Sequence, residues 1–190
     1  MQDASAETPA HAPVGLGGLP AQFFIPAAAS LQERRRRTLK HADTFGVFDH
    51  NGDALSEPGS PEGLFHRDTR YLSRLYLTVH GQRPLLLSST LGDDNAMLIC
   101  DLTNPDLFDP EGALVLEHDL LHVRRSRFLW NGACYERVAV RNFHDRPQRV
   151  RVAIAFAADF ADLFEVRGSR RERRGKMLEP EIGADCVTLA

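Results

Sequence analysis

Four ionisable residues stand close together in the segment that begins at Gly63: His66, Arg67, Asp68 and Arg70. An arginine guanidinium forms planar, bidentate pairs with carboxylates, so we expect Arg67 or Arg70 to pair with Asp68. Two apolar, strand-like runs follow, and the four charges would lie at the mouth of the hairpin they form. The cluster predicts a buried ion-pair network or a polar-ligand site. We favour a brace that holds a loop against a partner domain over direct binding of a ligand's hydroxyl groups.

A second candidate for chemistry is the carboxylate group Asp159, Asp162 and Glu165. Glycosidic cleavage requires two carboxyl groups, ~5–5.5 Å apart for retention or ~6.5–9.5 Å apart for inversion. Asp159 and Asp162 would be neighbours on a helical turn, which permits such a pair. Structural ion-pair networks also contain carboxylates of this kind. We therefore favour the alternative that they cap the turn and pair with the arginines of 167–171, and we assign no catalytic residue.

Asp49, Asn51 and Asp53 resemble the first ligands of a calcium loop. Such a loop requires Gly at its sixth position and Glu at its twelfth, where this chain has Ala54 and Ser60. The match fails, and a tight turn explains these residues better because Asn-Gly supplies the positive φ angles of a hairpin turn.

His118 and His122 have the spacing of a helical zinc pair. We interpret their segment as extended, which would separate the two rings by about 13 Å. The three cysteines, at positions 100, 134 and 186, add no metal-ligand spacing. We expect no metal and no cofactor. An odd number of widely spaced cysteines is typical of reduced thiols in a cytoplasmic protein.

Charge and hydropathy argue against two classes of partner. Lys and Arg total 23 against 26 for Asp and Glu, a net charge of −3. The basic clusters 34–37 and 167–176 contain no aromatic residue, whereas single-strand nucleic-acid grooves interleave the two. No apolar run approaches the ~20 residues needed to span a bilayer, and the polar start does not resemble a signal peptide. We expect no nucleic acid, no membrane and a cytoplasmic location.

The hydrophobic pattern is that of strands and turns. Val150, Val152, Ile154 and Phe156 alternate with polar or small residues, which predicts a strand with one buried face. Only 160–164 has helical spacing. Three further hairpin or strand signals are the pair 72–79 and 85–87, the run 96–102, and the pair 120–130 and 133–143 around Asn131-Gly132. The fold class predicted is mainly β, an antiparallel sandwich of two stacked sheets.

Aromatic residues on the predicted strands could stack on glucose rings. The candidates are Tyr71, Tyr76, Trp130 and Tyr135. Large aromatics on strands usually fill core or cross-strand positions, so we expect Trp130 in the core.

The domain organisation follows from composition. Residues 1–37 are rich in Ala, Pro and Gly before a run of arginines, which predicts a disordered or weakly docked tail. Residues 38–190 form the sandwich. The apolar segment 186–190 ends without a turn or polar tail, and an incomplete sandwich exposes a sheet edge. We expect either a fragment of a longer protein or a natural truncation.

Several long motifs occur in order and carry a resemblance. They are the segments Gly63–Thr90, Leu39–Phe45, Asp94–Asn95, Asp101–Leu107, Arg127–Trp130, Tyr135–Arg137 and Asp159–Gly168. Together they resemble the N-terminal β-domain of bacterial and archaeal glycogen-debranching-type amylo-α-1,6-glucosidases, over Thr38 to Lys176. The resemblance implies a supersandwich-like fold. It also implies that hydrolysis belongs to a C-terminal helical domain, an α/α-toroid, which this chain lacks.

The resemblance implies a non-catalytic accessory domain that packs on such a catalytic domain or subunit and shapes the entrance to an α-1,6-glucan site. Binding groups tend to lie on loops and strand ends. The substrate-binding or interface candidates are His66, Arg67, Asp68, Arg70, Asn95, Asp101, Asn104 and Asp106. The alternatives are a free-standing α-glucan-binding module and, third, a small hydrolase that uses Asp159 with Asp162 or Glu165.

Overall fold

The computed structural model describes residues 36–55, 60–173 and 175–190, all within the unit Leu31–Ala190. Most of the tail predicted for 1–37 lies outside the described residues, and Arg37 already begins the first strand. The elements in chain order are β1 (Arg37–His41), β2 (Thr44–Phe48), β3 (Gly63–His66), β4 (Thr69–Leu72), β5 (Arg74–Val79), β6 (Leu85–Leu91), β7 (Met97–Thr103), β8 (Leu107–Phe108), β9 (Leu114–Leu116), β10 (Leu121–Trp130), β11 (Ala133–Asn142), β12 (Val152–Ala157), α1 (Leu163–Val166), β13 (Glu181–Ile182) and β14 (Val187–Thr188).

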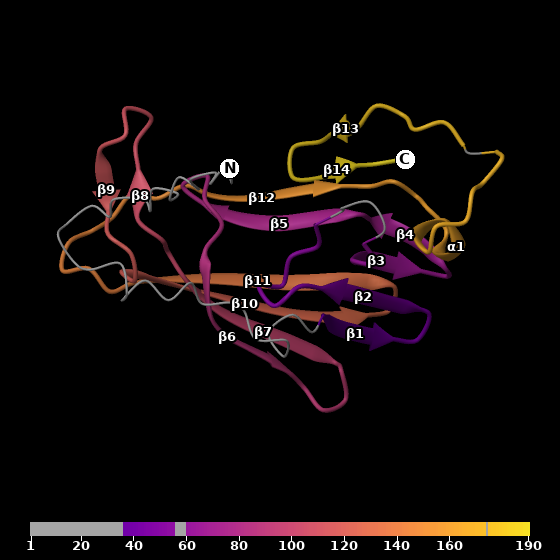
Figure 1. Ribbon diagram of the computed structural model, residues 1–190, viewed down its shortest axis with the longest axis horizontal. Helices are drawn as coiled ribbons and strands as arrows, with labels where there is room; N and C mark the ends of the chain where they lie inside the picture. Colours follow the sequence, from indigo (N-terminus) through magenta and orange to yellow (C-terminus); the bar gives the residue numbers. More distant parts are fainter. Residues whose placement is uncertain (1–35, 56–59, 174) are drawn as a thin grey trace, which may run out of the picture. The chain divides into compact units, whose positions relative to one another are not determined.

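Antiparallel sheets make up nearly all of the regular secondary structure of this body (Figure 1). Two sheets have four strands each, in the orders β1-β2-β3-β4 and β11-β10-β7-β6, and a third pairs β12 with β5. The hairpins β8-β9 and β13-β14 are two-stranded sheets of their own. The prediction of a mainly antiparallel β-sandwich is confirmed.

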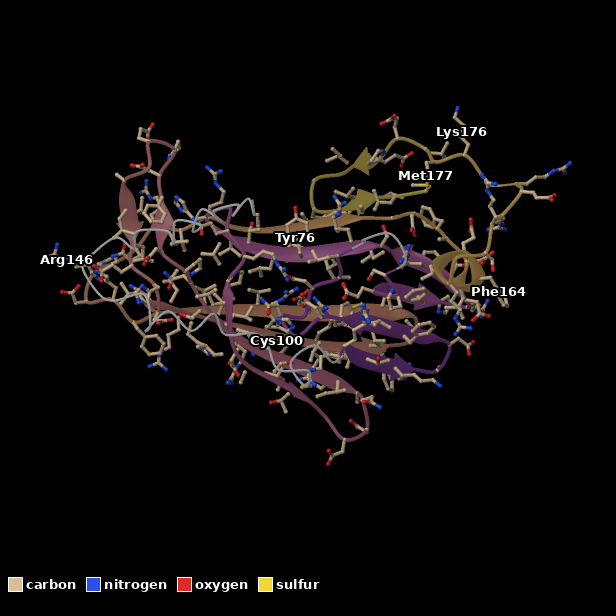
Figure 2. The ribbon with its side chains drawn as sticks, in the orientation of Figure 1. Tyr76, Cys100, Arg146, Phe164, Lys176 and Met177 are labelled. Carbon is tan, nitrogen blue, oxygen red and sulfur yellow. The ribbon has the colours of Figure 1, made fainter. Side chains whose placement is uncertain are left out.

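The main core lies between β5 and the sheet that contains β10. Alternate residues of β5 and β10 are buried, as a period of two requires. Leu77 and Val79 of β5 and Val123 of β10 have no exposed surface. Figure 2 places Cys100 of β7 among the interior side chains, and its burial raises the pKa of the thiol.

The β10–β11 hairpin is confirmed. Its turn residues Asn131 and Gly132 have φ angles of 47° and 77°, and Trp130 pairs with Ala133. Two residues of positive φ match the right-handed twist of the flanking strands. The predicted helical turn is also confirmed, as α1.

Two predicted hairpins are wrong, although their turns exist. Strands β5 and β6 do not pair, because β5 pairs with β12 and β6 with β7. The turn between them closes through backbone bonds that join Val79 and Gln82, and the chain then crosses to the other sheet. Gly52 likewise has a φ of 77°, but β2 pairs with β1 and β3. Residues that favour a tight turn indicate where the chain reverses direction, but they do not determine which strands pair.

Two arginines stand on the inner face of β10, where apolar residues are expected. Arg125 and Arg127 are each 2% exposed. Arg125 pairs with Asp53, and its Nε donates to Glu136 at 2.6 Å. Arg127 donates to Glu136 Oε2 at 2.8 Å and to the Gly52 carbonyl at 2.7 Å. A buried charge is tolerated only when it is paired and hydrogen-bonded.

This network joins separate parts of the fold. Asp53 also accepts from the Leu77 backbone N–H at 3.1 Å and from Arg83 at 2.7 Å. The guanidinium of Arg127 lies 4.1 Å from the centre of the Phe48 ring. The ionic network of Asp53, Arg83, Arg125, Arg127 and Glu136 therefore connects the turn after β2, strand β5 and the hairpin β10–β11.

Replacing Arg125 by Met should lower the free energy of unfolding by about 3 kcal/mol, because Asp53 and Glu136 each lose a buried partner. Asp53 keeps Arg83 and Glu136 keeps Arg127, so the loss of stability should lie at the low end of the usual range for breaking a buried pair. Urea denaturation measures this loss. The matched control is Arg124→Met, whose exposed guanidinium pairs with Asp101 at 2.7 Å and whose loss should shift the midpoint little. Equal shifts would contradict the network.

Acid should weaken the same network. Burial, the largest influence on Glu136, would raise its pKa, but the charges of Arg127 and Arg125 and their hydrogen bonds outweigh burial and lower the pKa. Its stabilising contribution is therefore complete above ~4.3, the ordinary pKa of Glu, and is lost as the pH falls through the folded pKa. Stability measured from pH 7 downward should fall less steeply below that value in Glu136→Gln than in the parent. The exposed control Glu111→Gln should follow the parent, and coincident Glu136→Gln and parent curves would refute the prediction.

Candidate functional site

Three tight turns gather at one end of the body. They are Ala42–Asp43, Arg67–Asp68 and Asn131–Gly132, and all but Asp43 have positive φ angles. The Arg67 N–H donates to the Asp43 carbonyl at 3.0 Å. The His66 ring lies 3.8 Å from the Cβ position that a side chain at Gly132 would occupy. We call this end, together with α1, the turn end. Loops clustered at one end of a rigid sandwich are common places for binding.

An ion pair between buried Arg70 and half-buried Asp159 holds α1 at the turn end. Arg70 is buried on β4, and its Nη2 lies 2.5 Å from Asp159 Oδ2. Its Nη1 donates to the carbonyls of Ser60 and Glu62. The Arg70 backbone N–H donates to the Ala161 carbonyl at 2.8 Å. The segment that leads into α1 is thus fixed against β4. The expected pairing of Arg70 with Asp68 is wrong, because Arg70 points inward and Asp68 lies in the exposed turn.

The other two carboxylates of this segment form a capping box. Asp162 accepts from the backbone N–H groups of Phe164 and Glu165 at 2.8 and 2.9 Å. Glu165 accepts from the Asp162 N–H at 3.0 Å. Arg171 lies 3.7 Å from Asp162 and 3.5 Å from Glu165. Their predicted role as caps paired with a following arginine is confirmed, whereas Asp159 pairs with Arg70 instead.

Aromatic side chains are exposed around these turns. Phe164 of α1 is 67% exposed, and Figure 2 shows it at the outer edge of the turn end. Tyr71 is exposed and packs edge-on against Phe160, at 5.7 Å between ring centres. Trp130 is 60% exposed and lies 4.6 Å from the His41 ring. The expectation of Trp130 in the core is wrong, because it follows buried Leu129 on β10 and therefore faces outward.

Three residues of the predicted charged cluster lie at the turn end, and each contacts a different partner. His66 Nδ1 is hydrogen-bonded to the Thr44 hydroxyl at 2.8 Å. Arg67 is exposed, and its nearest carboxylate is that of Asp43, at 4.0 Å. Asp68 contributes its carbonyl, which accepts from the Leu163 N–H at 2.8 Å. The cluster therefore forms no single buried network.

The remaining candidates lie on other parts of the fold. Asn95, in the β6–β7 turn, accepts from the Lys40 N–H at 3.2 Å. Asp101 lies along β7 and pairs with His122 and Arg124, and the hydrogen bond from Arg124 is the largest cause of its lowered pKa.

Asn104 and Asp106 organise the chain between β7 and β10. Asn104 is fully buried, and its side chain accepts from the N–H groups of 120 and 121 and donates to the Glu117 carbonyl. Asp106 accepts from the His118 backbone N–H at 2.8 Å. The sequence motif 101–107 thus carries structural roles at a distance from the turn end.

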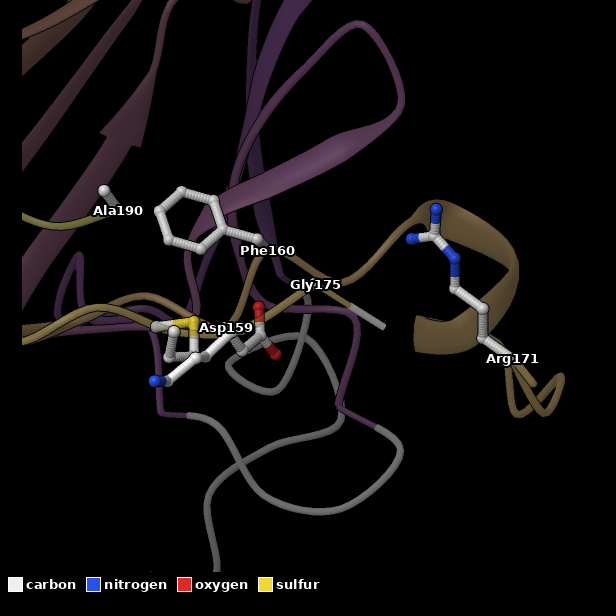
Figure 3. Close-up of a pocket in the computed structure, with 7 residues that line it drawn as sticks. Asp159, Phe160, Arg171, Gly175 and Ala190 are labelled. Carbon is white, nitrogen blue, oxygen red and sulfur yellow. The ribbon is translucent and has the colours of Figure 1, made fainter. Parts of the chain in front are cut away.

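A small hollow opens beside Asp159 (Figure 3). Its volume is about 290 Å³, and it is lined by Asp159, Phe160, Arg171, Gly175, Lys176, Met177 and Ala190. Asp159 is already paired with Arg70, and Arg171 with the capping box.

Within the described residues, no three His, Cys, Asp or Glu side chains are placed to hold a metal ion. No helix of that part of the chain is long and apolar enough to cross a bilayer.

Loss of the cap should loosen α1. Asp162→Ala removes the acceptor for two backbone N–H groups, which costs about 1 kcal/mol. Hydrogen exchange at Phe164 and Glu165 should accelerate severalfold. Asp43→Ala is the control, because its exposed carboxylate reaches only Arg67, at 4.0 Å. Unchanged exchange in Asp162→Ala would show that the cap does not hold the helix.

Comparison with known proteins agrees with this architecture. A family model described as the N-terminal domain of some glycogen debranching enzymes matches residues 39–190. No curated protein and no solved structure matches the chain significantly. The match covers most of the chain and confirms the resemblance seen in its motifs. The chain belongs to the family of N-terminal domains of glycogen debranching enzymes.

Proposed function

We propose that this chain is a non-catalytic accessory domain that packs through its turn end on an α/α-toroid catalytic domain or subunit. There it shapes the entrance to the α-1,6-glucan site. Family membership supplies the context. The observation that carries the proposal is Phe164, which is 67% exposed on a helix held by a capping box and preceded by the Arg70–Asp159 ion pair. The three free cysteines support a cytoplasmic assembly.

The bonding of the carboxylates supports an accessory role. Asp159 forms an ion pair with buried Arg70, and Asp162 and Glu165 form the capping box. A glycosidase needs one carboxyl group free to donate a proton and another free to attack or to activate water. The bonds that these carboxylates make serve the positioning of α1.

The composition of the turn end fits a protein interface. Exposed Trp and Tyr are the residues that most often dominate binding energy, and a polar rim usually surrounds them. Trp130, Tyr71 and Phe164 supply the apolar contacts, and Asp43 and Arg67 supply exposed charges beside them. The turns are tight, and Arg70 holds the segment that leads into α1. Few side chains or loops therefore need to be ordered on binding, which favours affinity.

The position of the charges explains how the domain would shape an entrance. Arg67 and Asp43 have side chains that are 78% and 71% exposed. Charged side chains at the edge of an interface can hydrogen-bond an approaching polysaccharide while the aromatic residues contact the protein partner. In this proposal Arg67 and Asp43 lie at the rim of the entrance, with His66 and Asp68 next to Arg67 at the same turn. Arg70 acts indirectly, by positioning α1.

A binding experiment tests the proposal. The chain is titrated calorimetrically with a separately produced α/α-toroid domain of a debranching enzyme. Phe164→Ser should weaken binding by at least about tenfold, because it removes a central apolar contact. The control is Phe108→Ser, an exposed phenylalanine on β8 at the other end of the body. Equal effects of the two substitutions, or glucose released from branched oligosaccharide by the purified chain alone, would overturn the proposal.

One observation favours the second candidate, an α-glucan-binding module. Phe128 and Tyr135 are exposed on the outer face of β10 and β11 and stack with ring centres 5.0 Å apart. Aromatic faces pack well against the apolar face of a sugar ring. Calorimetry of the isolated chain with branched maltodextrin discriminates the two candidates. Binding that Tyr135→Ala abolishes supports the module, and absence of binding leaves the interface role.

A further inference from the structure

The inner face of β12 is not covered as the rest of the core is. Val152, Ile154 and Phe156 pair in register with Val79, Leu77 and Leu75 of β5 and point to the same face of that sheet. The β5 residues are buried, whereas those of β12 are 39%, 44% and 43% exposed. The predicted alternation of this strand is present, but the expectation of a buried face is wrong.

Strand β11, in the other layer, also has an exposed apolar residue on its inner face. Val140 of β11 pairs with Val123 of β10, which has no exposed surface. Val140 itself is 43% exposed. Strand β11 ends the four-stranded sheet and β12 ends its two-stranded sheet. Figure 1 shows the two strands in different layers, joined by the segment 143–151. Among the described residues, the core is therefore open along one side, beside these two end strands.

Both end strands have backbone groups available for pairing. Within the described residues, β11 pairs only with β10, and β12 only with β5. A row of unpaired N–H and C=O groups on an end strand is a template for another strand. A strand added here would gain backbone hydrogen bonds and bury the exposed apolar residues together, which is the recognition mode of β-augmentation.

The charges beside the opening indicate which strand would fit. Four exposed arginines lie beside the opening: Arg137 and Arg141 on β11, and Arg149 and Arg151 just before β12. In the described part of the chain, no ion pair involves any of these four. Glu136, the carboxylate on β11, is already held by Arg125 and Arg127. A second copy of this chain would bring like charges together across the new pairing, which is destabilising.

We propose that the open side between β11 and β12 receives an amphipathic β-strand from the catalytic partner, with apolar residues facing the core and acidic residues facing these arginines. That the strand comes from the catalytic partner rests on the proposed function. That this surface binds a strand does not. The turn end and this open side are then two parts of the contact with one partner. The added strand covers the exposed apolar residues, and its acidic side chains set its orientation.

A synthetic probe tests the surface without the catalytic domain. The probe is a capped, fluorescent peptide of about eight residues, a usual strand length, in which Val alternates with Glu. Anisotropy should show saturable binding to the full chain. A peptide that alternates Val with Lys should bind at least about tenfold more weakly, because it meets the arginines with like charge. A Val/Glu peptide with alternate N-methylated amides should not bind, because it cannot extend the sheet.

Matched variants of β12 locate the site. Ile154→Ser, on the inner face, should weaken Val/Glu binding about tenfold. Ala153→Ser, the adjacent exposed residue on the outer face, should leave it unchanged. Both positions are exposed, so both variants should keep the parent circular dichroism spectrum.

Absence of Val/Glu binding, equal binding of the Lys peptide, or equal loss in both variants overturns the proposal. Self-association that Ile154→Ser abolishes would assign the surface to a second copy instead. Failure here leaves the toroid titration with Phe164→Ser as an independent test.

Discussion

The buried pairing of Arg125 and Arg127 with Asp53 and Glu136 is the interaction on which the rest of this fold depends. It replaces apolar packing at the centre of β10 and connects the turn after β2, strand β5 and the β10–β11 hairpin. Each charge has a defined partner, so the network specifies one alignment of the two layers. Breaking one pair would leave a buried charge, which makes misaligned packing costly.

This alignment determines which surfaces the domain presents. At the turn end, the separate ion pair of Arg70 with Asp159 and the cap at Asp162 hold α1, so that Phe164 faces solvent from a rigid element. Along the open side, the fixed layers leave Ile154 and Val140 exposed beside unpaired strand edges. Both surfaces combine exposed apolar side chains with exposed charges, and both enter the proposed contact with a larger protein partner.

The sequence predicted the local features well. Alternation identified β12, the Asn131-Gly132 turn identified the β10–β11 hairpin, and the cap followed from the spacing of the carboxylates around α1. Arg125 and Arg127 share the parity of Leu121, Val123 and Leu129, so their inward position was readable from the same alternation. The pairing of β5 with β12 was not readable, because it joins strands over 70 residues apart and no turn signal reports it. Trp130 has the opposite parity, so its outward position was readable from the same alternation, and its size alone led to the wrong expectation of a core residue.

The most direct test of the central claim is hydrogen exchange across the whole chain, alone and with an α/α-toroid catalytic partner. We predict that binding slows amide exchange, relative to the chain alone, at the turns 42–43 and 67–68, at α1, and along β11 and β12. Exchange at β8 and β9 should not change. The amides of β5 and β10 should be protected in both states, since the ionic network holds them. Protection confined to β8 and β9, or none anywhere, would contradict an accessory domain that binds through these surfaces.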